Sequence, residues 1–153
     1  MNEVKFLRDQ IKTTFEGDTA WHGPSLLKTL EGTSVEEAMS KPLGERHSIW
    51  ELVDHLAFWN EAVANAIRME KMPDPRKVED WPEMGNTESE WKASVGSLEK
   101  GVHLLLSELA EWTNEDLEKQ VPDAEYSFKQ MLHGVVHHNL YHTGQIAILR
   151  KKI

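Results

Sequence analysis

Histidines are the residues of this sequence best suited to chemistry, because the chain has eight of them and no cysteine. Four lie in one short stretch and form two pairs with four-residue spacing, His133 with His137 and His138 with His142. On a helix, side chains four residues apart lie on one face a turn apart, so each pair could offer two imidazoles to one metal ion. Such pairs also arise by chance, so the spacing alone does not identify a site.

The pattern around these histidines separates the two pairs. A helix over residues 128–151 turns by about 100° per residue. Its inward stripe then consists of Phe128, Met131, Val135, Asn139, Ile146 and Leu149. His138 and His142 fall within this stripe, about 40° apart. His133 and His137 point to the opposite side, and we expect them at the solvent-exposed surface.

A third histidine is expected to face the same core from another helix. In the helix predicted from Ser48 to about Glu70, His55 lies beside Trp59 on the flank of the apolar stripe. A buried imidazole needs a hydrogen-bond partner or a metal, because an unpaired polar group costs about 1–3 kcal/mol. Three imidazoles on one ion leave a position open for water or substrate, as in catalytic metal sites. The alternative is three core histidines satisfied by hydrogen bonds.

Helices are predicted along nearly the whole chain, because apolar residues recur at three- and four-residue steps and the alternation typical of strands is missing. The long helical segments are residues 4–15, 48–70, 87–109 and 128–151, with a shorter one over residues 26–30 and capped turns at Ser34 and Thr113. A polar connection that carries Pro73, Pro75 and Pro82 follows the second long segment. We therefore expect an all-α fold over residues 1–153, a single four-helix bundle domain with one long crossover connection and short extra helices.

Composition excludes several classes of function. The 26 acidic residues outnumber the 17 basic residues, and the net charge of −9 argues against a nucleic-acid partner. No apolar run approaches the roughly 20 residues that span a bilayer, and residues 1–10 lack the apolar core of a signal peptide. We expect a cytoplasmic protein that acts on a small molecule, with no membrane partner.

Three motifs, in this order along nearly the whole chain, resemble the DinB/YfiT-like superfamily. They are Ala-Trp-His-Gly-Pro-Ser-Leu at residues 20–26, Ser-Ile-Trp-Glu-Leu-Val-Asp-His-Leu-Ala-Phe-Trp at residues 48–59, and His-Asn-Leu-Tyr-His-Thr-Gly-Gln-Ile at residues 138–146. The last motif, His-x-x-x-His followed one residue later by Gly-Gln, is the most specific. The resemblance implies a four-helix bundle, often a homodimer, that binds a divalent ion.

The resemblance also implies the ligands and the kind of reaction. Carried over by position, the metal ligands are His55, His138 and His142, the same three that the periodicity selects. Zinc is the first expectation and nickel the next. Characterised relatives are metal-dependent thiol S-transferases or isomerases that use a low-molecular-weight thiol, and others have been labelled hydrolases. We expect a metal-dependent enzyme that activates a thiol or water; the alternatives are a hydrolase or a non-enzymatic bundle with a structural metal. Thr143 stands where relatives commonly have Arg, so a shared substrate is not implied.

Three further residues are candidates for lining or supporting the site. His22 lies at a Gly/Pro break and could reach the site entrance or remain a loop residue. Glu51 lies one turn before His55 and could orient it, although its position in a Ser48 capping box favours a structural role. Asn139 faces inward and is expected to satisfy a neighbouring polar group.

The remaining predictions concern packing. Trp50, Trp59 and Trp91 have helical spacing and are predicted to lie in the core. Trp81 is predicted to be exposed. Gly144 is expected to allow two helices to approach closely.

Overall fold

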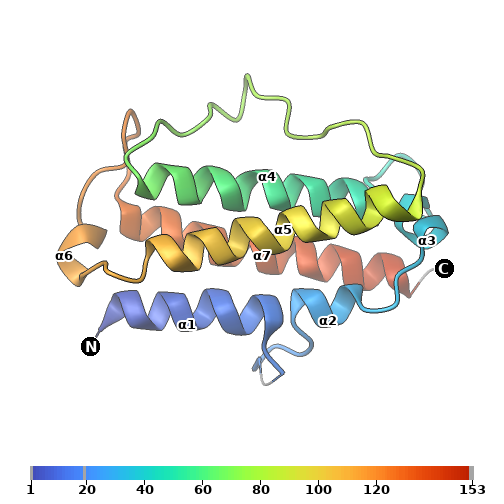
Figure 1. The fold of residues 1–153 in the computed structure, drawn as a ribbon, viewed down its shortest axis with the longest axis horizontal. Helices are drawn as coiled ribbons and strands as arrows, with labels where there is room; N and C mark the ends of the chain where they lie inside the picture. The colour runs from blue at the N-terminus through green and yellow to red at the C-terminus, as the bar shows by residue number, and fades with distance from the viewer. Residues whose placement is uncertain (1, 19, 152–153) are drawn as a thin grey trace.

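A computed structural model describes residues 2–18 and 20–151, and over these residues the chain is helical, without a strand (Figure 1). The four long helices are α1 (Glu3–Glu16), α4 (Ile49–Ile67), α5 (Glu88–Glu108) and α7 (Phe128–Arg150). The short helices are α2 (Leu26–Leu30), α3 (Val35–Met39) and α6 (Asn114–Leu117). The predicted all-α bundle with short extra helices is confirmed. Within the described residues, none of the helices combines the length and apolar character needed to span a bilayer.

The direction of the long helices explains the crossover. Figure 1 shows α1 and α7 running one way along the bundle and α4 and α5 running the other way. Because α4 and α5 are parallel, residues 68–87 must return along the bundle, and α4 with its 19 residues is about 28 Å long. This connection arches over α4 (Figure 1), and it therefore passes over the helix that carries His55.

Capping residues define where the helices begin. Capping boxes start five of the helices, at Ser34, Ser48, Thr87, Thr113 and Ser127. At the start of α4, the Glu51 carboxylate accepts a hydrogen bond from the Ser48 amide at 2.7 Å, which satisfies a backbone donor that the helix leaves free. The end of α4 is less well predicted: the helix stops at Ile67 rather than near Glu70, and Met69 beyond it has a φ of 67°.

Two tryptophans join α4 to α5 in the core. The rings of Trp50 and Trp91 lie 5.4 Å apart, and both side chains are buried. Each indole N–H has a partner, since Trp50 donates to Ser94 Oγ at 2.9 Å and Trp91 donates to the Thr33 carbonyl at 3.2 Å. The core prediction is confirmed for these two residues. It is wrong for Trp59, which is half-buried and lines a pocket described below.

The close approach of two helices occurs at Gly101 and not at Gly144. A Cβ built on Gly101 would lie 3.2 Å from the Ala57 carbonyl oxygen and 3.3 Å from the Glu61 nitrogen, both backbone atoms of α4. At Gly144 nothing lies within 4 Å of such a Cβ, so the expectation for that residue is wrong. The absence of a side chain at Gly101 is what lets α5 lie against α4.

We predict opposite changes in stability for substitutions at these two glycines. Gly101→Leu forces α5 away from α4 and should lower the free energy of unfolding by about 1–3 kcal/mol, as overpacked cores do. Gly144→Ala adds a methyl group in open space and removes a flexible residue from a helix, so it should raise that free energy by about 0.5–1 kcal/mol. Urea denaturation of both variants measures the difference. A Gly101→Leu protein as stable as the wild type would contradict the packing described here.

Candidate metal centre

Helices α4 and α7 bring three histidines together near the middle of the bundle. His55 on α4 and His138 and His142 on α7 each offer a ring nitrogen, and these atoms lie within 4.8 Å of one another. The Nε2 atoms of His55 and His138 are 3.1 Å apart. Two ligand nitrogens at about 2.0–2.1 Å from a tetrahedral zinc ion are separated by about 3.3 Å. The donor set and its spacing therefore fit one divalent ion.

Asp80 holds the outer nitrogen of His55. The Nδ1 atom of His55 lies 3.3 Å from both the backbone oxygen and the carboxylate Oδ2 of Asp80. The same Oδ2 accepts a hydrogen bond from Trp59 Nε1 at 2.8 Å. Because oxygen acceptors surround Nδ1, the proton resides there and the lone pair of Nε2 is directed to the cluster.

Gln145 holds His142 in the corresponding way. The Oε1 atom of Gln145 lies 2.6 Å from His142 Nδ1, so Nδ1 donates and Nε2 is free for a ligand bond. Neither the role of Gln145 nor that of Asp80 is predicted from the sequence. Gln145 could have been found, because it lies three residues after His142 on the same face of a helix. Asp80 lies in a connection without periodicity, and no local pattern identifies it.

The three imidazoles are in the form that a metal requires. Burial lowers the pKa of His55 and of His142 below the ordinary value, and for His55 the neighbouring His142 lowers it further. Burial, with His142 and His55 nearby, lowers the pKa of His138 to about 4. At neutral pH all three rings are therefore uncharged and keep a lone pair for coordination.

Trp81 covers the cluster on one side. Its indole is stacked against the His55 ring at 4.0 Å between centroids and against the His47 ring, on its other face, at 3.5 Å. Trp81 is half-buried, so the prediction that it is exposed is wrong. The connection over residues 68–87 thus supplies both a hydrogen-bonding partner and a cover for the cluster.

Two of the other candidate residues lie away from the cluster. His22 is exposed in the turn between α1 and α2 and is not among the grouped histidines. Glu51 caps α4 through Ser48 and also accepts a hydrogen bond from Lys41 at 2.9 Å. Its carboxylate therefore has the structural role that the capping box indicates.

Asn139 is buried and forms a reciprocal pair with Asn60. Each side-chain amide nitrogen lies 3.0 Å from the other's oxygen, which ties α7 to α4 next to the histidines. On the opposite side of α7, His137 is exposed and the partly exposed His133 lies 3.3 Å from a Glu3 carboxylate oxygen. The second histidine pair is thus outside the cluster, as the helical pattern predicts.

The DinB superfamily profile matches residues 19–146. This chain belongs to the DinB superfamily. No curated protein and no solved structure gives a significant match. The matched region of this DinB protein includes α4, the whole crossover connection and all three clustered histidines. The family assignment therefore covers the candidate site, and no relative's name assigns an activity to it.

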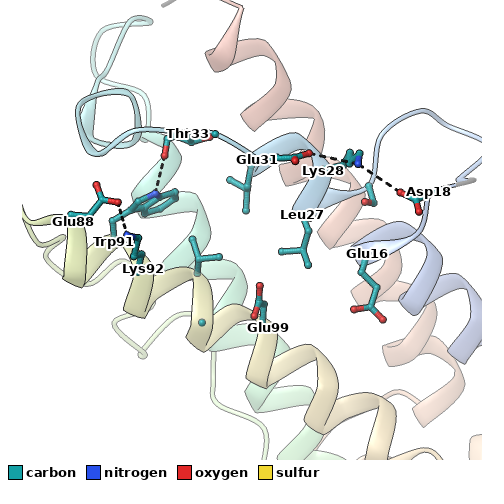
Figure 2. Close-up of a pocket in the computed structure, with 15 residues that line it drawn as sticks. Glu16, Asp18, Leu27, Lys28, Glu31, Thr33, Glu88, Trp91, Lys92 and Glu99 are labelled. Atoms are coloured by element: carbon teal, nitrogen blue, oxygen red, sulfur yellow. Dashed lines mark hydrogen bonds and ion pairs between the residues drawn. The ribbon is translucent and has the colours of Figure 1, made fainter.

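The protein has a pocket beside the cluster and another far from it. The first, of about 400 Å³, is lined by His55 and His138 together with Asp80. The second, of about 530 Å³, lies between α2 and α5 and is lined by charged side chains such as Glu99 and Lys92, with no histidine (Figure 2). The first pocket is the one lined by two of the three clustered histidines.

We predict that Asp80 supports metal affinity and Glu51 does not. Asp80→Ala removes the carboxylate that orients His55 and should weaken metal binding by about 10–100-fold. Glu51→Ala is the matched control: it removes an acid one turn from His55 and should lower stability by about 1 kcal/mol through the lost cap, with metal affinity unchanged. Competition titration with a chelator of known affinity compares the two. Equal losses of affinity would show that Asp80 has no specific role.

Proposed function

We propose that this protein binds one divalent ion through His55, His138 and His142 and is a metal-dependent enzyme that activates a thiol or a water molecule. The observation that carries the proposal is the convergence of three uncharged imidazoles at one point between α4 and α7. Three protein ligands leave a coordination position for an exogenous molecule. A pocket leads to that point and is lined by two of the three histidines.

Each part of the site has a definable task. A bound divalent ion would supply Lewis acidity, which lowers the pKa of a coordinated thiol or water into the physiological range. The histidines provide neutral donors, while Asp80 and Gln145 fix the orientation of two of the rings. Trp81 shields the His55 ring from solvent. Since the chain has no cysteine, a reactive thiol must come from a small-molecule cosubstrate.

The reaction class has two versions, thiol S-transfer and hydrolysis, and the first is our proposal. A purely structural metal would need a fourth protein ligand to close its coordination. Among the described residues the cluster contains three histidines, and His22, the fourth candidate, is exposed elsewhere. This arrangement favours an enzyme over a structural centre. Zinc is proposed as the ion, with nickel as the alternative, because imidazole ligands suit both. The homodimer and the cytoplasmic location remain predictions of the sequence.

We predict that metal binding depends on His138 and not on its neighbour His137. Protein purified without an affinity tag should hold about one ion per chain, and His138→Ala should weaken binding by at least about 100-fold, since it removes one of three ligands. His137→Ala is the control on the same helix, one residue away and exposed. Elemental analysis after dialysis measures both. Full metal content in His138→Ala, or loss in His137→Ala, would contradict the proposed ligand set.

The metal-loaded protein then separates the possible reactions. S-transfer requires turnover of a model electrophile that depends on an added small thiol and is lost in His138→Ala. Hydrolysis of an activated ester without thiol, with the same dependence on His138, would identify a hydrolase instead. Stoichiometric metal without either activity and without an exchangeable bound water would indicate a structural metal.

A further inference from the structure

The pocket beside the histidine cluster has apolar walls. Its volume is about 400 Å³, and four apolar residues line it: Trp59 and Val63 from α4, Pro75 from the crossover connection and Val135 from α7. His55 and His138 lie at its polar end. A molecule that reaches the cluster through this pocket must therefore place an adjoining group against hydrocarbon and indole surfaces.

The pocket contains one charged side chain, and that side chain already has partners. Asp80 Oδ2 accepts the Trp59 indole N–H at 2.8 Å and lies 3.3 Å from His55 Nδ1. No lysine or arginine lines the pocket. Along the apolar walls, away from the histidines, a carboxylate or phosphate would lose hydration without gaining a cationic partner, which is unfavourable.

The pocket between α2 and α5 differs from the pocket beside the histidines, because charged side chains line it. Figure 2 shows acidic and basic side chains along it, and Lys28 lies between Asp18 and Glu31 at 3.8 and 3.7 Å. The pocket beside the histidines has no such array. Its chemistry thus selects by apolar contact and not by charge.

We infer that the part of the substrate bound next to the metal centre is an uncharged aryl or branched alkyl group held by Trp59, Val63, Pro75 and Val135. The inference rests on the proposed function, because it names the substrate class of the same site. The apolar group of the electrophilic substrate would occupy the pocket and so hold the substrate in place. Any charged portion of the substrate or of the thiol must then extend outside this pocket.

Gly134 provides a variant that closes the pocket with little effect on folding. It lines the pocket on α7, is exposed, and has nothing within 4 Å of a Cβ built on it. A Cβ at Gly134 thus meets no other atom, and the rest of a leucine side chain in Gly134→Leu narrows the pocket that this residue lines. Gly144→Leu is the matched control, because Gly144 is also exposed on α7, has the same free space and does not line the pocket.

The experiment compares three probes by calorimetry on zinc-loaded protein: imidazole, phenylimidazole and the para-carboxylate of phenylimidazole. The phenyl group should increase affinity over imidazole by roughly 10–100-fold through buried apolar surface. The carboxylate should lose about tenfold or more of that gain. Gly134→Leu should remove most of the gain and leave zinc content and imidazole affinity unchanged, whereas Gly144→Leu should change neither.

The outcomes separate this inference from the proposed function. Equal affinity for phenylimidazole and its carboxylate, or a gain that survives Gly134→Leu, would overturn the inference while zinc binding stands. If the protein binds neither zinc nor nickel, the proposed function fails, and the two aryl probes are compared on metal-free protein. Tighter binding of phenylimidazole than of its carboxylate, with the difference lost in Gly134→Leu, would then support the inference of an apolar pocket. Equal binding of the two probes would overturn the inference.

Discussion

Three imidazoles in the bundle interior must all find partners for their nitrogens, and this requirement organises the structure around them. Asp80 and Gln145 satisfy the outer nitrogens of His55 and His142. The inner nitrogens face one another. The Nε2 atoms of His55 and His138 are 3.1 Å apart, so only one proton fits between them. The remaining lone pairs are therefore directed at a shared point beside the pocket. A single divalent cation at that point would satisfy all of them together.

The topology of the bundle and the construction of the site have the same cause. Because α4 and α5 run parallel, the chain must cross the length of the bundle between them (Figure 1). That crossing carries Asp80 to the outer nitrogen of His55 and Trp81 onto its ring face. His47, from the segment before α4, packs on the far face of the same indole. A shorter connection between antiparallel helices would leave His55 without a partner or a cover.

Features that depend on helical periodicity are predicted from the sequence. Contacts that depend on how distant segments of the chain pack together are not. Helical spacing was enough to separate His138 and His142 from His133 and His137. The capping patterns at Ser34, Ser48 and Thr113 located the starts of α3, α4 and α6. Asp80 could not be predicted, because its role depends on how a non-periodic connection folds back. The exposure of Trp81 and the helix contact assigned to Gly144 were wrong for the same reason. The packing of α5 on α4 decides which glycine lies at a helix crossing. The sequence of one helix alone does not contain this information.

The proposed metal ligands and the walls of the adjoining pocket come from different elements of this protein. The proposed ligands come from α4 and α7 alone, while the pocket walls also include Pro75 and Asp80 from the crossover. Substitutions in the crossover can therefore reshape the pocket without touching a ligand, which is how one fold supports several activities. Asp80 is the exception, because it belongs to the pocket wall and also orients His55. A change at that residue alters the shape of the pocket and the donor strength of a ligand at once, so the two functions cannot vary independently there.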